Sequence, residues 1–211
     1  MNEKSKISMA VIRRLPKYHR YLKDLLEKDI KRISSKELSD IIGFTASQIR
    51  QDLNNFGGYG QQGYGYNVEE LYYEIGKILG LDKAYKTIII GAGNLGQALA
   101  NYTNFDKVGF EVKALFDINP KLFGIKIRDI EIKDMDDVGQ FIKDNDIDIA
   151  IVCTNKDSAQ EVAEKLVSGG IKAIWNFAPT DLRVSDNVTV ENVHLVESLL
   201  TLTYLYKSTQ E

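Results

Sequence analysis

Apolar residues in the first third of the chain recur at helical spacing, and polar residues mark where each helix should begin. A first helix is predicted around Pro16, which a first turn tolerates, with apolar positions at Leu15, Leu22, Leu25, Leu26 and Ile30. Ser34-Ser35-Lys36-Glu37 has the pattern of a capping box, and the helix it opens contains Leu38, Ile41 and Ile42 and stops at Gly43. Thr45-Ala46-Ser47-Gln48 opens a third helix with a predicted buried face of Ile49, Leu53 and Phe56. This layout is typical of a helix-turn-helix, with an ordinary helical hairpin as the alternative.

The opposite face of the third helix consists of side chains that can hydrogen-bond to DNA. Gln and Asn bind adenine, Arg binds guanine and Ser binds either, whereas an average solvated face would contain more Lys and Glu. The residues concerned are Ser47, Gln48, Arg50, Gln51, Asn54 and Asn55. Residues 57–68 then alternate Gly and Tyr around Gly60-Gln61-Gln62-Gly63, which predicts a short β-hairpin. Together these elements predict a winged helix, with the third helix in the major groove and the hairpin at the flanking backbone or minor groove.

From residue 85 onward the pattern changes to alternating strands and helices. A β-branched run at 86–90 precedes Gly91-Ala92-Gly93-Asn94-Leu95-Gly96, and a helical pattern covers 95–102. In a strand–turn–helix unit the first glycine of G-x-G-x-x-G makes the tight turn, the second lets a pyrophosphate approach, and the third lets helix and strand pack closely. A second strand, 111–116, leads to Asp117, where this fingerprint expects an acid for the adenosine ribose. Gly91 to Gly96 and Asp117 are therefore predicted to bind a dinucleotide. Because a carboxylate repels a 2′-phosphate, this dinucleotide is predicted to be NAD(H) rather than NADP(H).

The remaining segments complete an α/β fold. Apolar strands are predicted at 147–153 and 171–177, with a helix at 158–167 capped by Asn155 or Asp157. Residues 194–207 form a terminal helix that is apolar nearly all round, which burial in a partner subunit explains. We therefore expect a winged helix-turn-helix domain at 1–80, a Rossmann-like domain at 81–192 and a dimerisation helix at 193–211.

Composition and charge narrow the class of protein. At 211 residues and 44% hydrophobic, the chain can hold two small ordered domains. Its single cysteine, Cys153, excludes an internal disulfide and fits a reducing cytosol, and no signal peptide or membrane span is visible, so a cytoplasmic location is expected. The net charge of −3 is uneven, because residues 4–36 contain 11 basic and 3 acidic side chains. That concentration favours a polyanionic partner.

Taken together, these motifs resemble the Rex family of redox-sensing transcriptional repressors over nearly the whole chain. The resemblance implies a homodimer with winged helices on Rossmann-like cores and with C-terminal helices swapped between subunits. Such proteins bind double-stranded operator DNA when NADH is scarce and release it when NADH accumulates, and so respond to the NADH/NAD⁺ ratio. The motifs are Arg14-Leu15-Pro16, Ser34 to Ser39, Ile49 to Leu53, Phe56-Gly57, Gly63 to Val68, Gly91 to Gly96, Phe116-Asp117 and Asn176-Phe177-Ala178-Pro179.

The resemblance also implies roles for particular residues. The nicotinamide end of NADH or NAD⁺ is expected near Thr154 and near Asn176, Phe177, Ala178 and Pro179, with Tyr102 also at the cofactor. Arg14 and Tyr102 resemble the family's switch residues, and His194 occupies the place where many relatives have an aspartate. A neutral imidazole cannot hold Arg14 as a carboxylate would, so His194 either takes a modified switch role or simply caps or packs.

The residues expected to contact DNA come from the first helix, the helix-turn-helix and the hairpin. In the hairpin, Gln61-Gln62 replaces basic residues often found there, which predicts a weaker attraction to phosphates and a lower salt dependence. The expected set is Lys17, Tyr18, Thr45, Ser47, Gln48, Arg50, Gln51, Asn54, Asn55, Phe56, Gln61, Gln62 and Tyr64.

Two other functions deserve comparison with this one. Tyr73-x-x-x-Lys77 has the spacing of a short-chain dehydrogenase pair, but it precedes the glycine loop instead of following it. The two histidines, His19 and His194, have no motif around them, and no metal-ligand spacing is present, so no catalytic or metal-binding residue and no enzyme activity is predicted. A nucleotide-gated scaffold whose basic end contacts protein or lipid is the third possibility, and the Gln/Asn/Arg helix face argues against it. Cys153, inside an apolar strand, is expected to be inert, with thiol sensing as the alternative.

Overall fold

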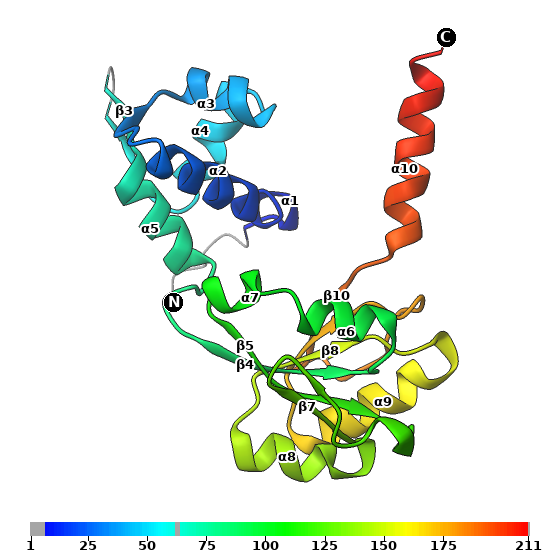
Figure 1. Cartoon of the computed structure of the whole chain (residues 1–211). Coiled ribbons are helices and arrows are strands. Elements are labelled where there is room, and N and C mark those ends of the chain that lie inside the picture. The colour runs from blue at the N-terminus through cyan, green and yellow to red at the C-terminus, as the bar shows by residue number, and fades with distance from the viewer. Residues whose placement is uncertain (1–6, 62–63, 211) are drawn as a thin grey trace. The chain divides into compact units, whose positions relative to one another are not determined.

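The computed structural model describes residues 7–61 and 64–210, and its contacts divide the chain into two compact units, Met1–Lys83 and Ala84–Glu211 (Figure 1). The division falls three residues after the expected end of the N-terminal domain at residue 80. Over the described residues, no helix is long and apolar enough to span a bilayer.

The N-terminal unit contains the predicted helices and hairpin. Pro16 lies in the first turn of its long second helix, Ser34 and Glu37 form the complete capping box, and Gly43 ends the following helix at φ +80°. Thr45 accepts a hydrogen bond from the Gln48 amide, which is one half of the second predicted box. The elements are α1 (Met9–Ile12), α2 (Leu15–Glu27), β1 (Arg32–Ile33), α3 (Ser35–Ile42), α4 (Ala46–Asn54), β2 (Gly60–Gln61), β3 (Gly65–Asn67) and α5 (Val68–Ile78).

One core joins these elements. Ile49 and Leu53 of α4 are buried as predicted, whereas Phe56 is half-buried and lies two residues beyond the end of α4. The strands β2 and β3 form the predicted hairpin, and the short strand β1 pairs antiparallel with β3. Together they make a three-stranded sheet of order β1-β3-β2. No sequence pattern predicted β1.

The second unit is built on a seven-stranded sheet of order β10-β9-β8-β4-β5-β7-β6, parallel except for the β6–β7 pair. Strands β5 and β7 follow β4 on one side of it, and β8 then pairs with β4 on its other side. Ligands of doubly wound sheets bind at the carboxyl ends of the strands where the order reverses, here β4 and β8. The elements are β4 (Tyr85–Ile90), α6 (Asn94–Ala100), α7 (Asn104–Lys107), β5 (Phe110–Asp117), the 3₁₀ helix η1 (Pro120–Leu122), β6 (Lys126–Ile127), β7 (Ile130–Asp134), the 3₁₀ helix η2 (Met135–Asp137), α8 (Val138–Asn145), β8 (Ile149–Val152), α9 (Lys156–Gly169), β9 (Ala173–Asn176), β10 (Thr189–Asn192) and α10 (Leu195–Ser208).

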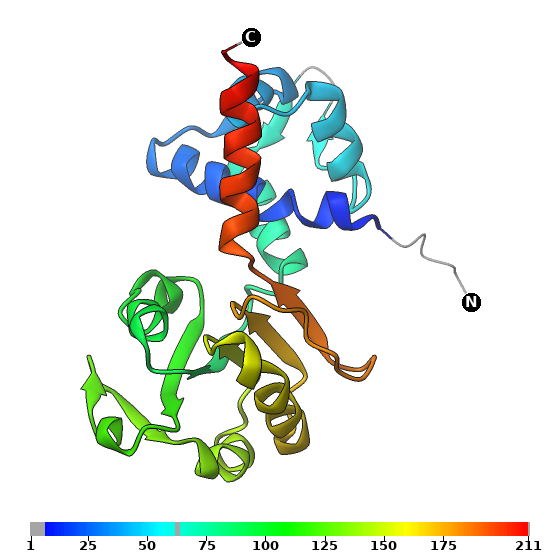
Figure 2. The same ribbon diagram turned by 90° about the vertical axis from the view of Figure 1, so that its right-hand side faces the viewer.

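Alternate residues of the central strands face two hydrophobic layers. Ile88 and Ile90 of β4 pack with residues of α8 and α9, whereas Ile89 packs with Ala100 and Leu99 of α6. Figure 2 shows the sheet between these helices. One sequence prediction needs correction: α6 ends at Ala100, so Tyr102 lies after the helix and not on it. Of the two residues predicted to cap α9, Asn155 is the one that does so.

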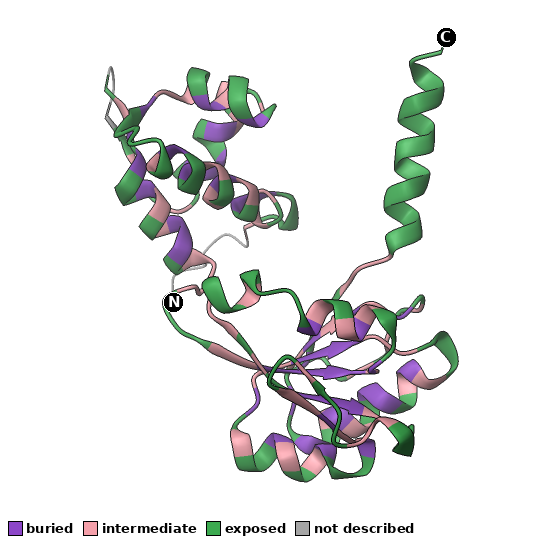
Figure 3. Cartoon of the chain, in the orientation of Figure 1, coloured by how far each residue is buried: buried purple, intermediate pink, exposed green. Residues whose placement is uncertain are grey.

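The C-terminal helix α10 has no buried residue in this single chain (Figure 3). Its large apolar side chains are between 56% and 72% exposed. They are Leu195, Val196, Leu199, Leu200, Leu202, Tyr204, Leu205 and Tyr206.

Candidate functional site

The glycine loop between β4 and α6 is shaped by close backbone packing at its two ends. Gly91 has φ +97°, and a Cβ there would lie 2.8 Å from the Cys153 carbonyl oxygen. A Cβ on Gly96 would lie 1.9 Å from the Gly91 carbonyl oxygen, so α6 can approach the loop only through a glycine. At Gly93, by contrast, no atom lies within 4 Å of the Cβ position. The open side of the loop is therefore at Gly93, where the fingerprint expects a pyrophosphate.

Two side chains hold this loop in place. Asp117, the last residue of β5, accepts a hydrogen bond from the Ala92 amide at 2.7 Å with one carboxylate oxygen and from the Asn119 amide at 2.8 Å with the other. Gln97 on α6 donates to the Ala92 carbonyl oxygen at 2.8 Å. Asp117 thus lies beside the loop at the end of the second strand, as the fingerprint requires of an acid that reaches the ribose. The role of Gln97 was not predicted.

Thr154 has an unsatisfied hydroxyl at the carboxyl end of β8. Its Oγ1 is buried and has no hydrogen-bond partner among the described residues. The Thr154 amide nitrogen lies 3.4 Å from the Cβ position of Gly91, so the hydroxyl belongs to the loop region. A buried hydroxyl without a partner is costly, and a ligand that hydrogen-bonds to it would remove that cost. This geometry fits a dinucleotide in the site.

Asn176, expected at the nicotinamide, stabilises the loop that follows β9. Its side chain is fully buried, donates to the Thr180 carbonyl and the Asn192 side chain at 2.8 Å each, and accepts from the Ala178 amide at 3.0 Å. Asn192 in turn donates to Asp181 at 3.1 Å, and the Nε2 atom of His194 lies 3.4 Å from the same Asp181 oxygen. A polar network therefore connects the loop after β9 with His194, the residue that precedes α10.

The network also corrects the simplest role considered for His194. His194 occupies the N-cap position of α10, but its side chain makes no capping hydrogen bond and faces Asp181. Of the other residues expected at the nicotinamide, Phe177 is half-buried, Ala178 is buried and Pro179 is exposed.

A row of aromatic side chains runs along one face of the sheet. Tyr102 contacts Phe105 edge-on at 5.0 Å between ring centroids, Phe105 contacts Trp175 at 5.9 Å, and Trp175 contacts Phe177 at 4.6 Å. The row links Tyr102, predicted as a switch residue, with Phe177, predicted at the cofactor. No local sequence pattern indicates Phe105 and Trp175, because only the tertiary fold brings them together.

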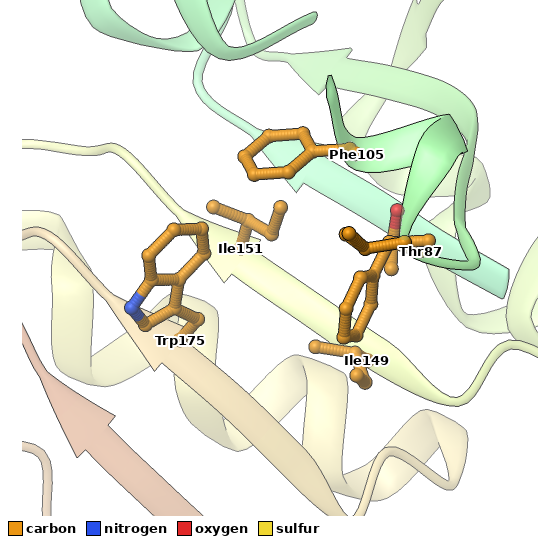
Figure 4. Close-up of a pocket in the computed structure, with 7 residues that line it drawn as sticks. Thr87, Phe105, Ile149, Ile151 and Trp175 are labelled. Atoms are coloured by element: carbon orange, nitrogen blue, oxygen red, sulfur yellow. The ribbon is translucent and has the colours of Figure 1, made fainter. Parts of the chain in front are cut away.

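An apolar cavity of about 300 Å³ adjoins this row (Figure 4). Phe105 and Trp175 line it together with Ile149 and Ile151 of β8, as the close-up shows. Its nearly wholly apolar lining offers no group for a phosphate or ribose, so it is distinct in chemistry from the glycine loop.

The predicted DNA-reading face of α4 is exposed in the N-terminal unit. Thr45, Ser47, Arg50, Gln51 and Asn54 are exposed, and Gln48 is partly exposed. Arg50 donates to the Ser35 hydroxyl at 2.8 Å. Asn55, also exposed, donates to the Gln51 carbonyl oxygen at 3.0 Å and so helps to end the helix.

Other residues of the expected DNA set lie in different environments. Tyr18 is fully buried and donates its hydroxyl to Asp52 at 2.7 Å, so it belongs to the domain core and not to the exposed face. Lys17 is partly exposed, with its ammonium 4.6 Å from the centre of the Phe44 ring. Tyr64 is exposed in the hairpin, Gln62 lies outside the described residues, and only the backbone of Gln61 is described, in β2.

Asp52 anchors a largely buried ion pair in the N-terminal unit. It is 2% exposed and accepts hydrogen bonds from Arg14 Nε and Nη2 at 2.6 and 2.7 Å. The Asp52 hydrogen bond raises the pKa of the Arg14 guanidinium, and burial raises that of Tyr18. The switch candidate Arg14 is thus bound to the buried side of α4. The helical period could have revealed Asp52, because it lies three residues after Ile49, on the buried face.

The residues that suggested a dehydrogenase or a metal site do not come together in the structure. Tyr73 contacts Tyr72 and Lys77 pairs with Glu74, and all four lie on α5 in the unit without the glycine loop. In the part of the chain that the structure describes, no three His, Cys, Asp or Glu side chains form a possible metal site.

Comparisons with known proteins agree with both halves of the fold. The family model described as CoA binding domain matches residues 82–180, and that described as putative DNA-binding protein N-terminus matches residues 6–54. The redox-sensing transcriptional repressor Rex of Thermoanaerobacter pseudethanolicus is 68% identical over 204 residues, covering 97% of this chain and 91% of that protein. The protein of the same name from Clostridioides difficile is 69% identical over 201 residues, covering 95% of this chain and 96% of that protein.

Solved structures give the same result. A crystal structure of RSP in complex with β-NAD⁺ and operator DNA has a TM-score of 0.93 at 66% identity, covering 98% of this chain and 95% of that chain. RSP in complex with β-NADH has a TM-score of 0.90 at 63% identity, covering 98% and 97%. The predicted fold class of a DNA-binding domain followed by a Rossmann-like domain is confirmed. The relatives are named as repressors and not as enzymes, which supports the prediction of a non-enzymatic role. The chain belongs to the Rex family of redox-sensing transcriptional repressors.

Proposed function

We propose that this protein is a transcriptional repressor that binds operator DNA as a homodimer and leaves it when NADH binds. The observation that carries the proposal is the full-length likeness to RSP, a Rex-family repressor solved both with operator DNA and β-NAD⁺ and with β-NADH. Operator DNA and NAD(H) in this role imply a cytoplasmic protein.

The residues around the glycine loop are suited to hold the dinucleotide. Gly93 leaves room for the pyrophosphate, and the first amides of α6 have no acceptor within the helix. Asp117 can accept hydrogen bonds from the ribose hydroxyls, and the Thr154 hydroxyl would gain the partner it lacks. Phe177, Ala178 and Pro179 lie at the end of β9 for the nicotinamide, while Asn176 keeps their loop in shape. NADH acts here as an effector, and no bond is made or broken.

The exposed apolar surface of α10 supports a dimer in which this helix is swapped between subunits. Eight large apolar side chains in contact with water form a larger patch than monomeric proteins usually expose. A chain that ends at residue 194 should therefore sediment as a monomer, whereas the full chain sediments as a dimer. A full chain that stays monomeric at micromolar concentration would contradict this part of the proposal.

Release of DNA requires NADH to bind one arrangement of the two winged helices more tightly than the other, since a ligand with equal affinity for both shifts nothing. Oxidised and reduced cofactors differ in charge and planarity at the nicotinamide, so the difference should arise there. Arg14, Tyr102 and His194 remain the candidates that pass this difference to the DNA-binding domains.

An anisotropy titration tests the proposal. Because the operator sequence is unknown, a duplex is first selected from a random pool with the protein in the absence of NADH. We expect tight binding to the selected palindromic duplex, weak binding to a scrambled one, and release by NADH at tens of micromolar but not by NAD⁺ at the same concentration. Tight binding that saturating NADH leaves unchanged would refute the sensing function.

A further inference from the structure

Arg32 lies on the hairpin sheet, outside every group of residues assigned so far. It begins β1, where it pairs with Asn67 of β3, and its side chain is exposed. The guanidinium carbon lies 5.8 Å from the centre of the Tyr64 ring, and that ring is 69% exposed. This is the geometry of a cation held over an aromatic face.

A residue close to Arg32 in the chain contacts α4, the helix that is predicted to enter the major groove. Three residues after Arg32, the Ser35 hydroxyl accepts the hydrogen bond from Arg50 of α4. Arg50 also lies close enough to Tyr66 of β3 for its charge to lower the pKa of that tyrosine, although burial raises it more. Residues 32–35 therefore connect the hairpin sheet, where Arg32 lies, with Arg50 of α4.

The charge of Arg32 is available to a partner. Within the described residues it forms no ion pair, whereas its neighbour Lys31 pairs with Asp29. A guanidinium can lie flat on an aromatic ring and still direct several N–H donors outward, which suits a phosphate.

We infer that Arg32, stacked on Tyr64, binds a DNA phosphate. It would thereby replace the basic residues that the hairpin lacks at positions 61 and 62. The inference rests on the proposed DNA-binding function and adds a residue to it. Because the contact is made to the sugar–phosphate backbone, it should strengthen binding to every DNA sequence equally.

Salt dependence distinguishes this role from others. Each lost phosphate contact lowers the slope of log affinity against log salt by about 0.9, so loss of Arg32 from both subunits of the dimer should lower it by about 1.8, which is about sixtyfold in affinity at 0.1 M salt. We expect Arg32→Gln to show this loss with both the selected operator and a scrambled duplex, so that their affinity ratio and the NADH effect stay the same. Arg32→Lys should keep the slope, because it keeps the positive charge. It should bind DNA more weakly than the parent, because an ammonium lacks the planar guanidinium that stacks on Tyr64.

Lys77→Gln is the matched control, because it also removes one positive charge from the same unit but at an ion pair on α5. It should leave the slope unchanged, and thermal unfolding should show that all variants remain folded. An Arg32→Gln variant with the parent's slope and affinity would overturn the inference, as would a loss confined to the operator at unchanged slope, which indicates a base contact. A parent that binds no duplex, or ignores NADH, would instead refute the proposed function itself.

Discussion

Gly91, Gly93 and Gly96 face different constraints, although the fingerprint treats them alike. A side chain at Gly91 or Gly96 would collide with the backbone of Cys153 or Gly91, so the fold itself needs these two glycines. No protein atom lies near the Cβ position of Gly93. The protein itself therefore has room for a side chain at this position, and the fingerprint relates the glycine to the approach of a pyrophosphate.

Gly93→Ala should therefore separate binding from folding. The methyl group has space in the protein, so the melting temperature should stay close to that of the parent, but it would occupy the approach of the pyrophosphate. We expect the NADH affinity to fall at least about tenfold, the size of effect that overpacking a well-fitted site produces. Calorimetric titration with NADH measures it.

Gly139→Ala is the control, since α8 also leaves open space at that position far from the loop in sequence. Gly96→Ala gives the opposite reference, a substitution that should unfold the domain. Unchanged NADH affinity in a folded Gly93→Ala protein would show that the dinucleotide does not approach the loop at this residue.

Cys153 illustrates how burial suppresses reactivity. Desolvation raises the pKa of its thiol from the ordinary 9.0 to about 12. The thiolate is the reactive form, so at neutral pH the native protein should react with a thiol reagent far more slowly than the unfolded chain. Rapid modification of the native protein would contradict this and favour thiol sensing.

The same shift predicts how stability depends on pH. Because folding raises the pKa of the Cys153 thiol, the contribution of this group to stability is fully present below pH 9.0. The contribution is lost as the pH rises from 9.0 toward 12, since the thiol of the unfolded chain ionises first. Urea unfolding compared with Cys153→Ala over that range should show a smaller loss of stability in the variant.

At the scale of elements, the sequence predicts those that depend on local signals. The capping box at Ser34 and the apolar runs at β4, β5, β8 and β9 identify their elements without reference to the rest of the chain. The strands β1 and β10 were missed, since β1 has two residues and β10 has a half-polar pattern. Both exist because a neighbouring strand pairs with them, β3 and β9 respectively, and such non-local pairing leaves no local signal.

The same distinction applies to the candidate site. The loop and Asp117 could be located from spacing alone, because the fingerprint describes a local strand–turn–helix unit. Asn176 could not be understood that way, because its partner Asn192 lies sixteen residues later on β10. Tyr102 was placed on a helix because a helical pattern covers 95–102, yet α6 stops earlier, where the Asn101 side chain donates to the Gln97 carbonyl.

The aromatic row makes the cofactor site observable. Trp175 is the only tryptophan in the chain, and it contacts Phe177 at the end of β9. Reduced nicotinamide absorbs light at the wavelengths that tryptophan emits, whereas oxidised nicotinamide does not. We expect NADH to quench the emission of Trp175 strongly and NAD⁺ to change it little, and a fluorescence titration measures both.

Phe177→Leu serves as the comparison, because it should weaken NADH binding while leaving the emission of the free protein at a similar intensity. If saturating NADH left the emission of Trp175 unchanged, the nicotinamide could not lie at the end of β9.

At the scale of the whole molecule, two of the proposed switch residues are already engaged within their own units. Arg14 is bound through two nitrogens to Asp52, and His194 faces Asp181. Removing Arg14 from Asp52 would leave a buried carboxylate with only Tyr18, which is costly. Signalling by exchange of the Arg14 ion pair is therefore unfavourable in this chain. Movement of α4 and Arg14 as one body agrees better with these contacts.

If NADH and DNA act on one equilibrium between arrangements of the dimer, their effects must be reciprocal. The factor by which saturating NADH weakens operator binding must equal the factor by which saturating operator weakens NADH binding. We expect both to be equal within error and at least about fivefold, the lower end of typical coupling. Anisotropy gives the first factor and quenching of Trp175 gives the second, on the same protein at one salt concentration.

The scrambled duplex provides the control, because the protein binds it mainly through its phosphates. Such binding should hold the winged helices less firmly in one arrangement. It should therefore lower the NADH affinity less than the operator does. Because reciprocity holds for any reversible coupling, a coupling factor below about fivefold is the outcome that would contradict two arrangements of the dimer. Direct competition of the cofactor phosphates for basic residues would be indifferent to the oxidation state of the nicotinamide, so NAD⁺ would then release DNA as well as NADH does.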